Sequence, residues 1–98
     1  MDEAAARALV EDLITGFGGD PGDPWTPVVT LLDRFERGWI VYYGAAEPDV
    51  MLAGNAPYLV DELSGDVVRT GSAEPVEHYV HNYLRTGNPH GRSSRAEA

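Results

Sequence analysis

One run of large side chains constrains the fold more than any other part of this sequence: Trp39-Ile-Val-Tyr-Tyr43. Side chains alternate across a β-strand, so this run would place apolar or aromatic groups on both faces of a sheet. One face would carry Trp39, Val41 and Tyr43, and the other Ile40 and Tyr42. A strand of this kind is typical of the centre of a sheet. The β-branched run that begins at Val28 precedes it across the turn Glu36-Arg37-Gly38, which predicts a first hairpin.

A second hairpin and two helices complete the expected elements. Strands at 58–61 and 66–70 flank Glu62-Leu-Ser-Gly65, where Gly65 can take the positive φ that a short turn needs. Apolar residues recur at spacings of three and four over residues 2–15 and 74–86, which predicts a helix in each range. In the second helix, Pro75 suits the first turn, Ser72 a capping role and Gly87 the end.

The order helix, hairpin, hairpin, helix predicts an α+β fold. We expect an antiparallel sheet of about four strands, with the N-terminal and the C-terminal helix packed on one face. The chain has 98 residues, which is enough for one core, and we expect a single domain over 1–87. Residues 88–98 carry no aliphatic side chain larger than alanine, which predicts a mobile C-terminal tail.

The composition and the histidine spacing exclude several classes of chemistry. The chain has no cysteine and no lysine, so disulfides, thiolate catalysis and Schiff-base chemistry are not available to it. His78 and His81 lie three residues apart, whereas the zincin motifs place two histidines four apart. Both histidines also fall opposite the apolar stripe of their helix. We therefore expect no catalytic residue, no metal site and no cofactor.

The negative charge indicates what kind of partner the chain would accept. Residues 1–66 hold thirteen acidic residues against three arginines. Such a surface repels phosphate backbones and anionic lipids, so we expect neither nucleic acid nor membrane as a partner, and a basic protein suits it better. The simpler alternative is that the acidity only keeps a small protein soluble. No signal peptide or membrane span can be drawn in the sequence, which predicts a cytoplasmic protein.

The expected contact region is the acidic strand and loop region around the irregular segment 44–57. Two tyrosines, Tyr42 and Tyr58, have no evident structural role, and tyrosine is a common anchor in protein interfaces. Loops between hairpins are well placed to contact a partner. The predicted partner-binding residues are Tyr42, Glu47, Asp49, Tyr58 and Glu62.

An ordered set of motifs over about residues 28–84 resembles the YrhB-type family, also called immunity protein 35. The motifs are Gly38-Trp-Ile-Val-Tyr-Tyr43, Met51-Leu-Ala-Gly-Asn-Ala-Pro-Tyr-Leu-Val-Asp61, Ser64-Gly65, Thr70-Gly71 and Pro75-Val-Glu-His-Tyr-Val-His-Asn-Tyr83. The resemblance implies a small α+β protein from a bacterial polymorphic-toxin locus. It further implies a non-catalytic immunity protein that binds and neutralises a cognate toxin. Other members stand alone, so a small stress or chaperone-like protein is the alternative.

Elementary chemistry assigns structural roles to the residues that carry this resemblance. Gly54 and Asn55 suit a turn with positive φ, Pro57 restricts the entry into the following strand, and Trp39 is large enough to fill the core. Asp61 and Gly65 complete the set of motif residues that we expect to be structural.

Overall fold

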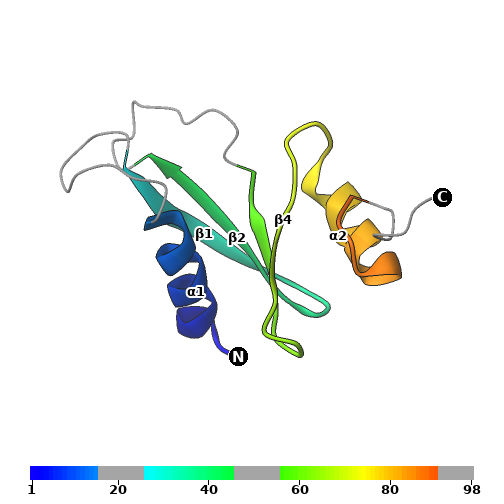
Figure 1. Ribbon diagram of the computed structural model, residues 1–98, viewed down its shortest axis with the longest axis horizontal. Coiled ribbons are helices and arrows are strands. Elements are labelled where there is room, and N and C mark those ends of the chain that lie inside the picture. The colour runs from blue at the N-terminus through cyan, green and yellow to red at the C-terminus, as the bar shows by residue number, and fades with distance from the viewer. Residues whose placement is uncertain (16–25, 46–55, 91–98) are drawn as a thin grey trace.

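Four antiparallel strands form one sheet in the chain order β1-β2-β3-β4, with one helix before and one after them (Figure 1). The computed structural model describes residues 1–15, 26–45 and 56–90. Its elements are α1 (Glu3–Thr15), β1 (Pro27–Phe35), β2 (Gly38–Ala45), β3 (Tyr58–Asp61), β4 (Val67–Arg69) and α2 (Val76–Thr86). The predicted α+β fold with two hairpins is confirmed.

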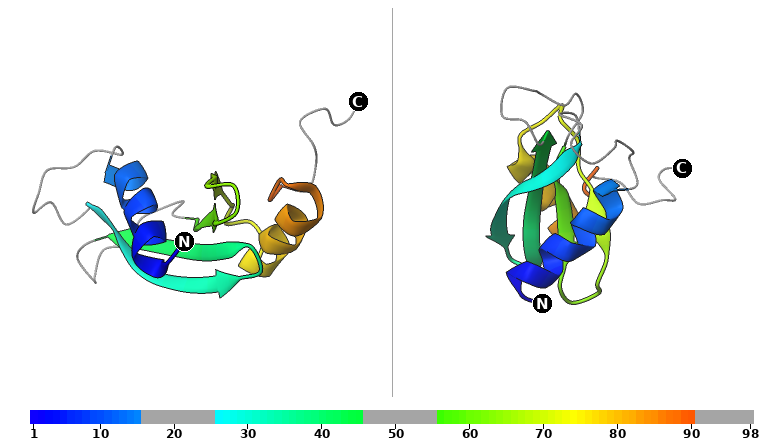
Figure 2. Two further views of the ribbon diagram at one scale, coloured as in Figure 1. Left: turned by 90° about the horizontal axis from the view of Figure 1, so that it is seen from below. Right: turned by 90° about the vertical axis from the view of Figure 1, so that its left-hand side faces the viewer.

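The two helices cover opposite faces of the sheet. On one face α1 buries Ala6, Val10 and Ile14 in a cluster with Val41, Tyr43 and Val60. On the other face Ile40 and Leu59 pack with Tyr83 of α2. In the right-hand view of Figure 2, α1 lies in front of the strands and α2 lies behind them.

The expectation that both helices share one face is therefore wrong. The reason lies in β2, which carries apolar side chains on both faces of the sheet. Each face must therefore be covered to remove these side chains from water. Cross-strand pairing extends both faces: Trp39 pairs with Val60 on the α1 side, and Ile40 pairs with Leu59 on the α2 side.

The helix ends follow the expected residue types with one exception. Asp2 accepts a hydrogen bond through Oδ1 from the backbone N–H of Ala5 at 2.9 Å, which caps α1. Pro75 is the N-cap residue of α2, and no side chain caps that end, so the capping role predicted for Ser72 is wrong. Gly87 ends α2 with φ of 79° and donates to the carbonyl of Tyr83.

The β3–β4 turn is held by Asp61. Its Oδ1 accepts hydrogen bonds from the backbone N–H groups of Leu63 and Ser64 at 2.9 and 3.2 Å. Gly65 follows with φ of 81°, which confirms the predicted positive φ. Just before β3, the carbonyl of Pro57 accepts bonds from the N–H and the hydroxyl of Thr70, so Pro57 joins the two ends of the hairpin.

The chain remains attached to α2 beyond residue 87, where the mobile tail was expected to begin. Pro89 is buried, and its carbonyl accepts a hydrogen bond from the side-chain amide of Asn82 at 3.2 Å. His90 meets the ring of Tyr79 edge to face. The contacts of α2 thus include residues 88–90, and residues 91–98 lie outside the described part of the chain.

Candidate functional site: a groove between the first hairpin and α2

An open groove of about 680 Å³ lies between the turn end of the β1–β2 hairpin and α2. Its apolar residues come from both sides: Phe35 and Ile40 from the strands, and Val76, Val80 and Leu84 from α2. Phe35, Val76 and Val80 are only partly buried, although they pack against the cluster on this face. The groove therefore offers apolar surface to the solvent at the seam between helix and sheet.

The charges around this groove are mostly negative. Its lining includes the carboxylates of Asp33, Glu36 and Glu77. Arg34 also lines it, but both of its terminal nitrogens donate to the Glu62 carboxylate, at 3.0 and 3.2 Å. Arg34 is thus already paired, and that pairing lowers the pKa of Glu62. Among the described residues that line the groove, the acids Asp33, Glu36 and Glu77 thus outnumber the one arginine.

Tyr42 is the predicted partner-binding residue that the structure places in the groove. Its side chain is half-buried on the α2 face of the sheet. Burial raises the pKa of the Tyr42 hydroxyl, and the nearby charges of Asp33 and Glu77 raise it further. The hydroxyl thus stays protonated beside two carboxylates, where it can donate or accept a hydrogen bond.

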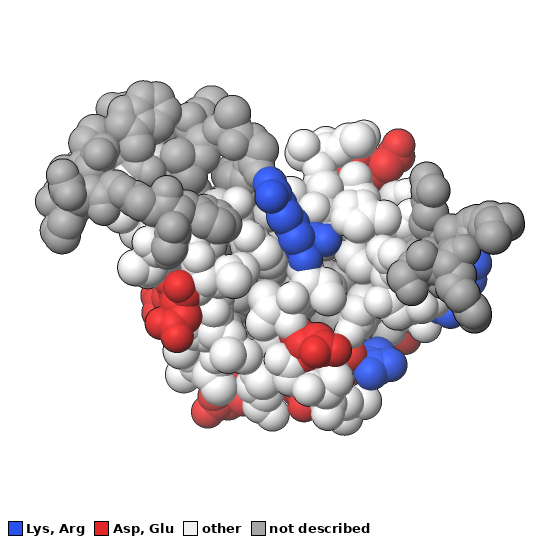
Figure 3. Space-filling model, viewed as in Figure 1, with Lys and Arg blue, Asp and Glu red and all other residues white. Residues whose placement is uncertain are grey.

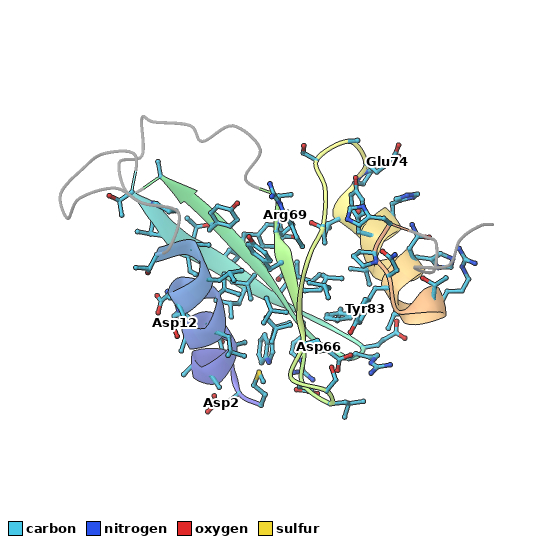
Figure 4. All side chains as sticks on the ribbon, in the orientation of Figure 1. Asp2, Asp12, Asp66, Arg69, Glu74 and Tyr83 are labelled. Atoms are coloured by element: carbon cyan, nitrogen blue, oxygen red, sulfur yellow. The ribbon has the colours of Figure 1, made fainter. Side chains whose placement is uncertain are left out.

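A buried network beside the groove fixes α2 against the sheet. Asp61 is 1% exposed, and its Oδ2 accepts a hydrogen bond from the Tyr83 hydroxyl at 2.6 Å and pairs with Arg37 at 2.8 Å. Figure 4 shows Tyr83 reaching from α2 toward the β3–β4 turn, where Asp66 is labelled. The Tyr83 ring also contacts Phe35 edge to face at 6.2 Å. The wall formed by α2 is therefore tied to the strands at a defined position.

The pKa values in this network reflect both burial and partners. Burial alone would raise the pKa of Asp61, but the hydrogen bonds from Tyr83, Leu63 and Ser64 and the charge of Arg37 outweigh it, and the pKa is lowered. Burial and the bond to Asp61 raise the pKa of Tyr83 to about 12. Asp61 is thus an anion and Tyr83 a neutral donor at neutral pH.

Two other predicted contact residues lie away from the groove. Tyr58 is 4% exposed and stacks on Tyr43 in the cluster under α1, with ring centroids 5.8 Å apart. Its predicted role as a partner anchor is wrong, because its side chain faces the covered side of β3. Glu62 is held by Arg34 and lies 3.8 Å from the Met1 amine.

The remaining predicted residues divide between the described and undescribed parts of the chain. Trp39 packs at the edge of the α1 cluster, donates from Nε1 to the Met1 carbonyl at 3.3 Å, and carries the guanidinium of Arg34 4.6 Å above its ring. Glu47, Asp49, Gly54 and Asn55 lie outside the described residues, so their predicted roles stay predictions.

Sequence reasoning missed the acids that the fold brings together here. Asp33 and Glu36 come from the first hairpin, and Glu77 comes from a helix forty-one positions after Glu36. The available signal was the strand alternation that places Asp33 on the same face as Ile40, its cross-strand partner. In Figure 3 the acids of the visible face lie at separate places, so net charge alone would not locate the groove.

The described residues hold neither a metal-binding cluster nor a membrane-spanning helix. Among residues 1–15, 26–45 and 56–90 there is no group of three or more metal-ligating side chains. Of the two histidines on α2, His81 lines the groove and His78 does not. The side chain of His78 contacts that of Asn82. No helix in the described part of the chain has the length and apolarity needed to cross a bilayer.

Comparison with known proteins gives one informative relative. The chain is 39% identical over 62 residues to Uncharacterized protein YrhB of Escherichia coli strain K12. The chain is YrhB-like over this span. The match covers 57% of this chain and 66% of YrhB, which is just under two thirds of that protein. No protein-family model matches the chain, and no solved structure does.

Proposed function

We propose that this chain is a cytoplasmic, non-catalytic immunity protein that binds a cognate toxin domain through the groove between the first hairpin and α2. The observation that supports the proposal is the combination of an apolar floor with an acidic rim. Asp33, Glu36 and Glu77 surround apolar side chains that the fold leaves partly exposed. The resemblance to the YrhB-type family adds the expectation of a toxin partner.

The two parts of the groove would contribute differently to binding. Apolar contact with Phe35, Val80 and Leu84 would supply most of the affinity, because buried apolar surface and well-packed anchors dominate interface energies. The carboxylates would speed association with a basic surface and disfavour acidic competitors. Glu62 would act indirectly, because it pairs with Arg34 and so reduces the positive charge beside the groove. Glu47 and Asp49 remain proposed contacts.

The charge part of this proposal predicts a salt-dependent association rate. The variant Asp33→Asn, Glu36→Gln, Glu77→Gln should bind the cognate toxin domain with a slower on-rate than the parent protein does. Raising the salt concentration should make the two on-rates more alike. A matched control removes the same charge from α1: Glu3→Gln, Glu11→Gln, Asp12→Asn. These residues are exposed on the opposite side of the sheet. Surface-plasmon kinetics at two ionic strengths measure the difference.

Tyr42→Ala tests the anchor in the same assay. We expect its off-rate to rise by about fivefold or more, which corresponds to a loss of about 1 kcal/mol, and we expect weaker rescue of cells that express the toxin. Full rescue by both the Tyr42 variant and the groove charge variant would place the interface elsewhere. An equal loss of on-rate in the α1 control would mean that net charge, rather than this groove, steers association.

A stand-alone chaperone-like role is the other candidate, and exposed apolar side chains favour it. Leu31 is 53% exposed and Leu63 is 76% exposed, so the chain has apolar surface outside the groove as well. A protein of that kind should suppress the aggregation of a heat-unfolded client enzyme at stoichiometric amounts. Suppression without any toxin binding would favour this role over immunity.

A further inference from the structure

The wall of the groove is a helical ridge. Val76, Val80 and Leu84 lie four residues apart along α2 and all line the groove. At 1.5 Å per residue this ridge is about 12 Å long, slightly more than two helical turns. Rows of side chains at i and i+4 are the surfaces that pack into the grooves of a second helix.

The sheet surface beside this ridge is only partly covered. Leu31 pairs with Tyr42 across β1 and β2, on the face that α2 occupies, and it is 53% exposed. Val28, which pairs with Gly44 farther along the same hairpin, is 37% exposed. Apolar surface thus continues from the groove past Tyr42, whereas α1 packs against the same two strands on the opposite face. In the described part of the chain, α1 covers one face of this hairpin, while Leu31 and Val28 stay partly exposed.

The secondary structure of the groove disfavours an extended occupant. A bound strand obtains its backbone hydrogen bonds from a free sheet edge. Here one wall is helix α2, whose backbone groups are already bonded within the helix and offer nothing to a strand. The other wall includes residues of β1, an edge strand, so an added strand could pair on that side alone. A helix satisfies its own backbone hydrogen bonds and needs only side-chain contacts from the site.

We propose that the groove is filled by a basic amphipathic α-helix of the partner, which lies along α2 and presents an apolar stripe to Phe35, Val80 and Leu84. Its Lys or Arg residues would flank the stripe and face Asp33, Glu36 and Glu77. This inference rests on the proposed function and adds the class of partner segment. The expected length is about three turns, set by the ridge and by the exposed surface beyond Tyr42.

A set of three synthetic peptides tests the inference on the full chain. The first has about 14 residues, with leucine at i, i+3, i+4, i+7 and i+11 and lysine or alanine elsewhere. The second peptide is the first with one central alanine replaced by proline. The third is the first with every lysine replaced by glutamate. We expect the first peptide to bind in fluorescence anisotropy, and the other two to bind about tenfold more weakly or worse.

Two substitutions locate the binding. Leu84→Asn should weaken the lysine helix about fivefold or more, because Leu84 lines the groove. Leu13→Asn is the matched control on α1, where Leu13 is 43% exposed on the opposite side of the sheet, and it should leave binding unchanged. Circular dichroism confirms that both variants fold, and Tyr42→Ala provides a second groove variant.

The outcomes separate this inference from the proposed function. Equal binding of the proline peptide, equal losses for the two leucine variants, or no binding of the lysine helix would each overturn the helical occupant. If the toxin domain still binds and still depends on Tyr42 and the groove acids, the immunity proposal survives that result. If the lysine helix binds at Leu84 but no toxin does, the immunity proposal fails and the groove remains a site for basic helices.

Discussion

Asp61→Ala is expected to lower the free energy of unfolding by about 3 kcal/mol, since it removes a buried carboxylate that accepts three hydrogen bonds, whereas the Arg37 side chain left behind is 41% exposed and can be hydrated. The carboxylate accepts hydrogen bonds from Leu63, Ser64 and Tyr83 and pairs with Arg37. Its removal leaves the Tyr83 hydroxyl, on a side chain that is 6% exposed, without an acceptor. Urea denaturation measures the loss. Asp66→Asn, an exposed carboxylate in the same turn, should cost less than about 0.5 kcal/mol.

The pH dependence of stability gives an independent reading of the same residue. The folded state lowers the pKa of Asp61, so the unfolded state binds the proton more readily. The stabilisation is therefore present above the unfolded pKa of about 3.9 and is lost as the pH falls through the folded pKa. The pKa of Glu62 is lowered too. On acidification the parent protein therefore loses stability through the protonation of both carboxylates. Asp61→Asn should be less stable than the parent at pH 7 and should lose less on acidification.

An Asp61→Asn variant that lost as much stability as the parent between pH 5 and pH 2 would contradict this account, because the carboxylate would then not be the titrating group. A double-mutant cycle with Tyr83→Phe checks the main partner. We expect the two substitutions to be non-additive, since they remove the two ends of one hydrogen bond.

Gly38→Ala is expected to destabilise the fold by about 3 kcal/mol or more, at the upper end of the cost of overpacking. A Cβ atom at Gly38 would overlap the backbone carbonyl oxygen of Val60, and it would also come within 3.0 Å of the backbone nitrogen of Glu62. Backbone atoms of a paired strand cannot rotate away as a side chain can. The β2–β3 pairing, in which Gly38 faces Asp61, would have to shift.

Gly44→Ala is the matched control for this prediction, because it adds the same methyl group to the same strand. Its nearest contact would be the side chain of Thr30 at 3.6 Å, which is ordinary van der Waals distance. Thermal unfolding should show a fall in Tm of about 12 °C or more for the Gly38 variant and little change for the Gly44 variant. Similar melting temperatures for the two variants would mean that β2 and β3 separate easily at this point.

Much of the local structure was predictable because it depends on neighbouring residues in the chain. Strands and helices could be assigned from apolar spacings of two and of three to four, and α1 and α2 begin within two residues of the expected positions. Gly65 and Gly87 were predictable for a related reason, since turns and helix ends that need positive φ favour glycine. The two hairpins also followed, because a short connection places two consecutive strands side by side, whereas the pairing of β2 with β3 across the longer segment 46–57 was not predicted.

Tertiary structure decided which surfaces are covered, and hence where the candidate site lies. The alternation along β2 indicated two apolar faces but could not assign a helix to each, so Tyr58 was expected at the surface and is buried under α1. Asp61 finds Arg37 and Tyr83 at separations of twenty-four and twenty-two residues, and Arg34 finds Glu62 at twenty-eight. Strand and helix periodicity do not encode such pairs. They arise only when β3 and α2 dock on the first hairpin, and the same docking brings Asp33, Glu36 and Glu77 around one apolar groove.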